Sequence, residues 1–196
     1  MTSAISLAIM GLFMWSGATG ITASTTTWAS PVPPAATSTV ETALSLSVRL
    51  TGYNAVPEQT DGDPHITASG AYSNPAVIAA RSRDLAETLP FGTVIALENA
   101  EKNVNCGFET VDHLIGYRVI ADSMHPKKQK RIDVLLDAAD TVMIGVNGKP
   151  RKATNPAIAL GLCNVTMRVV GKVSLKNIPA TQKELALMMS HTLAVR

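Results

Sequence analysis

The sequence predicts a mostly β protein that folds as a closed barrel or a sandwich. Apolar and polar residues alternate with a period of two where the domain begins, at 44–51, as they do in a strand with one buried face. Several more apolar runs of strand length follow, and turn signals rich in Asn, Asp, Gly and Pro separate them. Many short strands with few helices are typical of these two architectures.

Length and composition fit one packed domain. The chain has 196 residues, of which 46% are hydrophobic and 16% charged. This is enough for a single core with a leader and tails, and the composition excludes wholesale disorder. The net charge of +2 and the lack of aromatic residues among the basic ones argue against nucleic-acid binding.

The N-terminal segment has the pattern of a secretory leader. The first 40 residues carry no charged side chain, and an apolar run at 5–15 is followed by small residues. We therefore expect a signal peptide over 1–30, a proline-broken linker over 31–43, and export to the periplasm or the extracellular space. The run is shorter than the roughly 20 residues of a membrane span, so no stable span is expected after processing. No basic residue lies near Met1, and the alternative is a disordered or membrane-tethered N-terminus.

The strands of the domain at 44–175 are expected in a definite order. The first has Leu44, Leu46, Val48 and Leu50 on its buried face. The others are expected at 77–80, 93–97, 116–121, 132–136, 141–146 and 165–173. Turn signals lie at 61–64, 73–75, 90–92 and 147–150, and the Asn-Gly of the last one predicts a hairpin.

Only short helices interrupt this pattern. Two internal ones are expected, at 82–88 and at 155–162, the second with Asn155 as its cap and Pro156 in its first position. Thr181 and Glu184 have the spacing of a capping box before an apolar run. This predicts a terminal helix at about 181–194, within a C-terminal segment 176–196.

The two cysteines, Cys106 and Cys163, leave two interpretations open. In an exported protein they would form a disulfide, and in the cytosol they would be two buried thiols. Neither belongs to a C-x-x-C pair, so zinc or redox chemistry has little support. We expect no metal and no cofactor.

The segment most informative about chemistry runs from Ala121 to Val134. Asp122 and Asp133 each adjoin an apolar run, and a polar loop separates them. A strand–loop–strand layout would place both carboxylates at one end of a sheet, where their proximity would raise one pKa. A carboxylic acid with a raised pKa can protonate a glycosidic oxygen near neutral pH. The alternative is that both aspartates form turns or caps.

Five blocks of the sequence resemble, in the same order, the pattern of the three-aspartate (3D) domain family. Asp122, which directly follows Ala121, resembles the aspartate of its Ala-x-Asp, and Ile132-Asp133 matches its Ile-Asp at a similar separation. The other blocks are Thr51-Gly-Tyr53, Thr67-Ala-Ser-Gly70, Val77-Ile-Ala79 leading into Leu89-Pro-Phe-Gly-Thr93, and Asn155-Pro-Ala with Leu160-Gly161 before the last strand. The resemblance covers roughly residues 46–173.

The resemblance implies a six-stranded double-psi β-barrel, a fold shared with the MltA-type lytic transglycosylases. It also implies cleavage of the MurNAc–GlcNAc bond of peptidoglycan without water, giving a 1,6-anhydro product. Asp133 matches the last aspartate of the family and is the expected acid/base, and Asp122 would tune its pKa. Tyr53, Thr67 and Ser69 lie in matched blocks and are expected to bind substrate, although a core position for Tyr53 is an equal alternative.

The sequence departs from the family pattern at the first aspartate. Arg81 stands where that aspartate is usual, and Asp84 is the nearest candidate for it. The loop between Asp122 and Asp133 also differs, because it carries Met124-His-Pro and a basic run.

The basic run between the two aspartates suggests an anionic substrate. Lys127 and its neighbours would attract the peptide stems or lactyl carboxylates of the cell wall, and the alternative is a solvated loop. His125 is expected beside them at the substrate, with a merely exposed histidine as the alternative. The stretch Asp61-Gly-Asp63 has too few regularly spaced oxygens for a cation loop and is expected to be a turn.

Two functions follow as hypotheses. The first is a murein lytic transglycosylase that uses Asp133. The second is a non-catalytic barrel that binds glycan strands or a partner protein through the same groove, and a purely structural envelope protein is a more remote third. The expected partner is peptidoglycan, and the expected state is a monomer.

Overall fold

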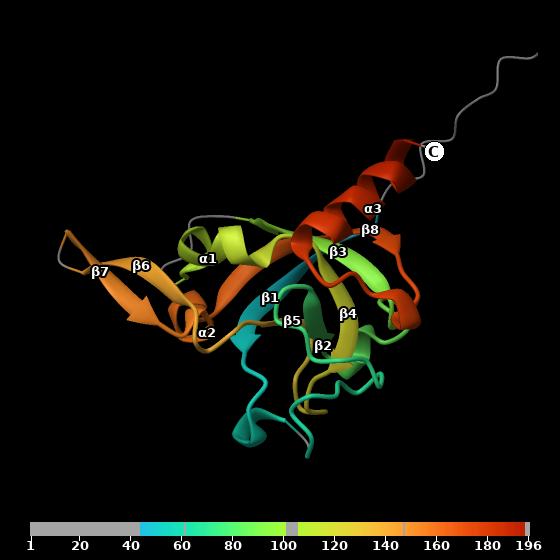
Figure 1. The fold of residues 1–196 in the computed structure, drawn as a ribbon, viewed down its shortest axis with the longest axis horizontal. Coiled ribbons are helices and arrows are strands. Elements are labelled where there is room, and N and C mark those ends of the chain that lie inside the picture. Colours follow the sequence, from blue (N-terminus) through green and yellow to red (C-terminus); the bar gives the residue numbers. More distant parts are fainter. Residues whose placement is uncertain (1–43, 61, 101–105, 147, 195–196) are drawn as a thin grey trace, which may run out of the picture. The chain divides into compact units, whose positions relative to one another are not determined.

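The computed structural model describes residues 44–60, 62–100, 106–146 and 148–194. Most of them form strands, and six strands close into a barrel: β1 (Ser45–Tyr53), β2 (Ile78–Arg81), β3 (Thr93–Asn99), β4 (Arg118–Ser123), β5 (Arg131–Leu135) and β8 (Cys163–Lys172) (Figure 1). The expected mostly β barrel is confirmed. The predicted signal peptide and linker lie outside the described residues.

The barrel has the pairing of two interlocked halves. Its strand order is β1-β5-β2-β4-β3-β8, with β1 parallel to β5 and β2 parallel to β4, while the remaining neighbours are antiparallel. The first three strands (β1, β2, β3) and the last three (β4, β5, β8) have the same pairing pattern. β1 is parallel to β5 just as β4 is parallel to β2, and β1 is antiparallel to β8 just as β4 is antiparallel to β3. This exchange symmetry is the arrangement of a double-psi barrel.

The barrel wall is apolar on both faces. Val134 and Leu135 follow one another in β5 yet belong to different buried clusters, because successive side chains of a strand point to opposite faces. One cluster continues into α1 (Phe108–Ile115) and α2 (Pro156–Leu160), and the other into α3 (Gln182–Ala194). Strands buried on both sides form a stable frame for the loops at the barrel ends.

Two of the expected helices form with their predicted caps. The Ala157 amide donates to the Asn155 side chain (3.1 Å) at the start of α2. Before α3, the Glu184 amide donates to the Thr181 hydroxyl (3.2 Å), and the Thr181 amide donates to the Glu184 carboxylate (3.1 Å). Both capping predictions are therefore confirmed.

The other internal helices differ from expectation. The helix expected at 82–88 is only a 3₁₀ turn, Arg83–Leu85. α1 was not expected, although Phe108, Val111 and Ile115 are buried at helical spacing. It begins at Gly107 without a side-chain cap, so the usual start signal is absent from its sequence.

A hairpin and a disulfide complete the domain. β6 (Thr141–Val146) and β7 (Lys149–Thr154) form a separate two-stranded sheet beside the barrel, as expected from the turn at 147–150 (Figure 1). Cys106 and Cys163 are joined in a disulfide, which decides between the two interpretations of these residues. Within the described part of the chain, no helix is both long and apolar enough to span a membrane.

Candidate active site

A row of side chains crosses four neighbouring strands at one end of the barrel. Asp133 of β5 is paired with Thr51 of β1 and with Ala80 of β2, and Ala80 is also paired with Asp122 of β4. Paired residues point to the same face of a sheet, so both carboxylates lie on one side of the wall. One strand separates them, which puts their strands roughly 10 Å apart.

A register shift brings Asp122 into this row. Ala79 pairs with Ile120, but the next residue, Ala80, pairs with Asp122. The skipped residue, Ala121, is the extra residue of a bulge, a feature that re-aims the side chains that follow it. Without this shift Asp122 would pair with Arg81 and point to the opposite face.

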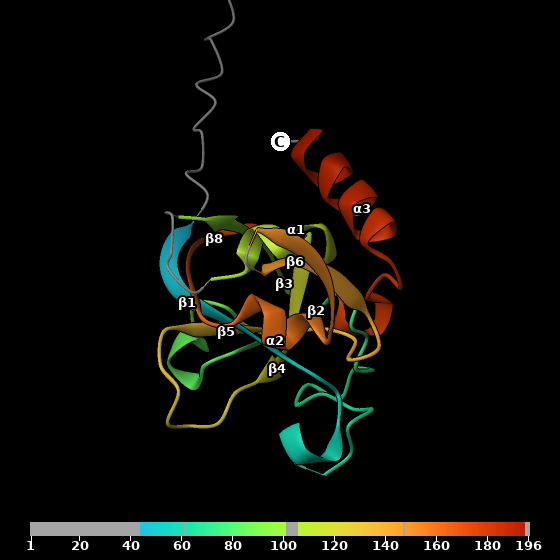
Figure 2. The same ribbon diagram turned by 90° about the vertical axis from the view of Figure 1, so that its left-hand side faces the viewer.

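The row forms the floor of a cleft of about 460 Å³. Figures 1 and 2 show that its two walls, the connections before β2 (teal to green) and between β4 and β5 (yellow), lie at the same end of the barrel. The first wall contributes residues from 59 to 73, and the second contributes residues from 123 to 128. Segments far apart in sequence therefore enclose the two aspartates.

The carboxyl group of Asp133 lies on the floor of this cleft. Its Oδ1 is shielded from solvent and has no hydrogen-bond partner among the described residues. Burial raises the pKa of Asp133 to about 6, and the negative charge of Asp122 adds to the shift, while a hydrogen bond from Thr51 and the charges of Arg131 and Lys128 oppose it. Near neutral pH both protonation states are thus accessible.

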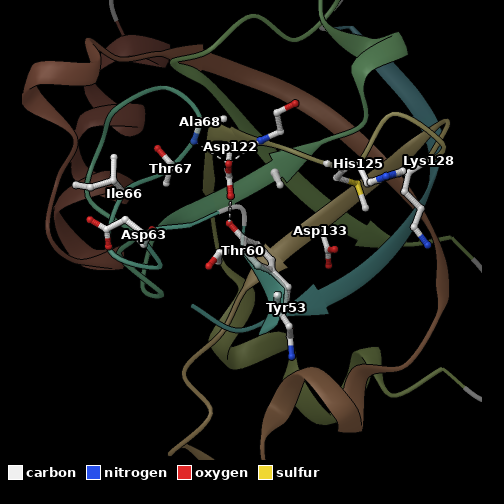
Figure 3. A pocket seen from close by; sticks show the side chains of 15 residues that line it. Tyr53, Thr60, Asp63, Ile66, Thr67, Ala68, Asp122, His125, Lys128 and Asp133 are labelled. Atoms are coloured by element: carbon white, nitrogen blue, oxygen red, sulfur yellow. Dashed lines mark hydrogen bonds between the residues drawn. The ribbon is translucent and has the colours of Figure 1, made fainter. Parts of the chain in front are cut away.

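Asp122 has a different environment, because both of its oxygens are engaged. Oδ2 accepts from the Tyr53 hydroxyl (2.8 Å), and Oδ1 accepts from the amides of Ala68 (2.9 Å) and Ser123 (2.8 Å). The Ser69 amide donates to the Ala121 carbonyl beside it (3.1 Å). Asp122 therefore holds the first wall of the cleft against β4 (Figure 3).

Tyr53 lines the cleft and also contacts one of the buried clusters. Burial raises the pKa of its hydroxyl above the ordinary value, and the charge of Asp122 raises it further. The phenol therefore keeps its proton and acts as a donor to Asp122. The sequence left two interpretations of Tyr53, a groove residue and a core residue. Both hold, because the side chain lines the cleft and also packs against the core.

Of the other residues expected to bind substrate, some line the cleft and some do not. Thr67 and His125 line it. Ser69 is not a lining residue, but its hydroxyl lies 3.1 Å from that of Thr67. Lys127 is not one either, and the basic side chain that lines the cleft is Lys128.

Asp84 and Arg81 both lie outside the cleft lining. The Asp84 carboxylate accepts from the Lys130 amide (2.9 Å) and so fixes the basic loop. Arg81 is buried, its Nε donates to the Leu89 carbonyl (2.7 Å), and its guanidinium lies 4.8 Å from the centre of the Phe91 ring. The position of the family's first aspartate therefore contributes no carboxylate to the floor of the cleft.

Sequence reasoning missed most of the first wall, including Gln59, Thr60 and Ile66. The turn expected at 61–64 begins at a residue outside the described ones; after it, the His65 amide donates to the Asp63 side chain (2.8 Å). The available signal was length: the connection from β1 to β2 is long, and long loops in compact domains are usually functional. Among the described residues, no group of three or more His, Cys, Asp or Glu is placed to hold a metal ion.

A buried arginine supports the strands that carry the site. Arg118 of β4 is fully buried, and this burial lowers the pKa of its guanidinium to about 9. The guanidinium donates to carbonyl oxygens of five residues, namely Pro75, Ile78, Leu114, Ile115 and Leu135. It thus connects β2, β4 and β5 to the last turn of α1.

Comparisons with known proteins add little to this geometry. No family model and no curated protein matches the chain. A solved structure with some similarity is a point mutant of an expansin from Clavibacter michiganensis in complex with cellohexaose, at 12% identity and a TM-score of 0.33. The match covers 67% of this chain and 52% of the expansin chain, so the chain spans about half the length of that protein. A TM-score of this size is too low to transfer a function.

Proposed function

We propose that this protein is an exported lytic transglycosylase that cleaves MurNAc–GlcNAc bonds of peptidoglycan with Asp133 as its acid/base. The observation that carries the proposal is the environment of Asp133: a shielded, unpaired carboxyl oxygen at the floor of a cleft, with burial raising the pKa to about 6. Such a group can both give and take a proton near neutral pH.

The proposed reaction uses this one carboxyl twice. Protonated Asp133 donates its proton to the glycosidic oxygen while the bond from that oxygen to C1 of MurNAc breaks. The resulting carboxylate then takes the proton of the C6 hydroxyl of the same MurNAc, and O6 forms the new bond to C1. The products are a 1,6-anhydro sugar and a free GlcNAc end, and Asp133 is again protonated.

The state of Asp122 supports a single-carboxyl mechanism over ordinary hydrolysis. A hydrolytic glycosidase needs a second carboxylate that acts on water or on C1. Both oxygens of Asp122 accept hydrogen bonds from the protein itself, so this carboxylate is committed to holding the cleft wall. Asp122 is therefore proposed as a positioning residue.

The lining of the cleft fits a polar glycan that carries anionic groups. Thr60 and Thr67 offer hydroxyl groups in the first wall, and His125 and Lys128 lie in the second. A cation next to the acid would attract the carboxylates of lactyl groups or peptide stems. The disulfide agrees with the proposed export, because such bonds persist mainly in oxidising compartments.

A non-catalytic glycan-binding barrel is the second candidate, and Arg81 is the observation that favours it. Where the resembling family usually has its first aspartate, this chain has an arginine engaged in packing. A cleft with two of three aspartates could retain binding without chemistry.

Incubation of the protein with peptidoglycan sacculi separates these candidates. We expect 1,6-anhydro muropeptides by mass spectrometry, and we expect Asp133→Asn to abolish them. Asp137→Asn, an exposed aspartate outside the cleft lining, is the matched control and should leave them unchanged. Co-sedimentation with sacculi and no anhydro product would instead support the binding module.

A further inference from the structure

The β6–β7 hairpin has no part in the proposed reaction. It forms its own sheet beside the barrel, and Figure 1 shows it pointing to a different side from the walls of the cleft. In β7 the basic residues Lys149, Arg151 and Lys152 are all exposed. These three side chains are therefore accessible to a binding partner.

The charge of this region has one sign. The sequence has no Asp or Glu between Asp140 and Glu184. None of the three hairpin cations lies within 4.0 Å of a carboxylate of the described residues, since the ion pairs there join other residues. The hairpin therefore presents positive charge that the described part of the domain does not neutralise.

The strand register distributes these cations over both faces of the ribbon. Lys152 is paired with Met143, so these two share a face, whereas Arg151 is paired with Ile144 on the opposite face. Lys149 precedes Arg151 by two residues and lies on the same face as it. At the base of the hairpin Val142 is buried in the core, while the cations lie further out on β7.

We propose that this hairpin docks edge-on to an anionic lipid surface. A linear polyanion laid along one face of the ribbon would reach the cations of that face only. A layer of lipid headgroups surrounds an inserted edge from both sides and can contact all three. Met143, which is 59% exposed, and the exposed Pro150 add apolar contact next to the charges, and this mixture suits a membrane interface.

Electrostatics sets the expected strength. Each Lys or Arg close to an anionic bilayer strengthens binding by a factor of about five, so three cations together contribute on the order of 100-fold. The attraction should weaken as salt rises, because exposed charges are screened. This inference does not depend on the reaction proposed for the cleft.

The test is flotation of the full chain with vesicles of equal parts phosphatidylglycerol and phosphatidylcholine. We expect binding that falls on the order of 100-fold in the triple variant Lys149→Gln, Arg151→Gln, Lys152→Gln. The matched control, Lys172→Gln, Lys176→Gln, Lys183→Gln, removes the same charge from exposed lysines elsewhere and should retain it. All variants carry the same apolar N-terminal residues, so any binding by that stretch is common to them.

Equal vesicle binding by the two triple variants would overturn the proposal. The proposal would also be overturned if the triple variant at Lys149, Arg151 and Lys152 lost binding to heparin, a soluble polyanion, but bound vesicles as the wild type does. That result would indicate a polymer partner instead. A second readout places the hairpin directly: the fluorescence of Met143→Trp, after subtraction of the wild-type signal, should shift to the blue with anionic vesicles and not with pure phosphatidylcholine. Absence of that shift on vesicles that bind the protein would also contradict it.

Discussion

At the scale of single residues, Asp133 combines a feature that suits chemistry with one that disfavours folding. Ionising a carboxyl that has one oxygen shielded from water and without a donor costs free energy. The pKa of this group is raised to about 6 in the folded protein, against about 3.9 in an unfolded chain. Its contribution to stability is therefore complete below pH 4 and is lost as the pH rises through 6.

The first prediction follows from this loss of stability with rising pH. At pH 8 the Asp133→Asn variant should be more stable than the wild type by about 2–3 kcal/mol, because it removes the buried charge. At pH 4 the two proteins should be nearly equal, since the wild-type carboxyl is then protonated. Urea denaturation at both pH values measures the difference.

Asp122→Asn is the contrasting variant. It replaces an acceptor of three hydrogen bonds and should lower the free energy of unfolding by about 1–3 kcal/mol at both pH values. Absence of stabilisation by Asp133→Asn at pH 8 would show that the burial of Asp133 has no energetic effect. Stabilisation by Asp122→Asn would show that the hydrogen bonds of Asp122 contribute less than the repulsion between the two carboxylates.

The second prediction concerns the pH dependence of the proposed reaction. Its first step needs the protonated form of Asp133, whose pKa is raised to about 6. The rate of release of anhydro muropeptides should therefore be highest below pH 6 and fall about tenfold for each further pH unit above it. A rate that is constant from pH 6 to pH 8 would exclude Asp133 as the acid.

At the scale of elements, β1 and α2 are in close contact at Gly52. A Cβ at Gly52 would lie 2.9 Å from the Cα of Ala157 in α2. The helix therefore packs directly on the backbone of the strand that carries Thr51 and Tyr53.

The third prediction follows from that contact. Gly52→Ala should displace α2 and lower the free energy of unfolding by about 1–3 kcal/mol. Gly145→Ala in the hairpin is the matched control, because a Cβ there meets no atom within 4 Å, and we expect it to be neutral or slightly stabilising. Thermal unfolding of both variants provides the comparison, and similar midpoints would contradict close packing at Gly52.

The fourth prediction concerns the connection that Arg118 makes between elements. Arg118→Met would leave several buried carbonyl groups of β2, β5 and α1 without their donor. Each unsatisfied group costs about 1–3 kcal/mol, so the loss should exceed about 3 kcal/mol in urea denaturation. A loss below about 1 kcal/mol would mean that water or other donors replace the guanidinium.

The sequence predicted the barrel strands well, because their signal is local. Alternation in β1 and the apolar run of β8 follow directly from burial, and the Asn155 and Thr181 caps are also local features. α1 was missed because it starts without a capping side chain. Tertiary packing of Phe108 and Val111 stabilises it instead.

The candidate site was predictable only in part, for a physical reason. The order and spacing of Asp122 and Asp133 are visible in the sequence. Their alignment depends on the antiparallel pairing of β2 with β5, on the parallel pairing of β2 with β4 and on the register shift after Ala79, which are properties of the closed barrel. Two of the hydrogen bonds that distinguish the two carboxyls, those from Tyr53 and Ala68 to Asp122, likewise come from residues far away in sequence.

At the scale of the whole molecule, the disulfide encloses the site-bearing half of the barrel. Cys106 and Cys163 are 57 residues apart, and the loop they close contains β4 and β5 with both aspartates. A crosslink of this length restricts the unfolded chain, which stabilises the folded one by about 4 kcal/mol in the chain-entropy treatment. The site itself is held by strand pairing, so its geometry should not depend on the bond.

The last prediction separates these two effects. Reduction should lower the free energy of unfolding by about 4 kcal/mol, while the activity of the protein that remains folded should stay close to that of the oxidised form. The double variant Cys106→Ser, Cys163→Ser should show the lowered stability without reductant and should not respond to it. Urea denaturation, with and without reductant, gives the stability, and sacculus digestion at urea concentrations well below the midpoint gives the activity.

Loss of activity while the protein stays folded would show that the disulfide also fixes the cleft. Cys163 begins β8, which pairs with β1, so a displacement of β8 after reduction would then shift Thr51 and Tyr53 of β1.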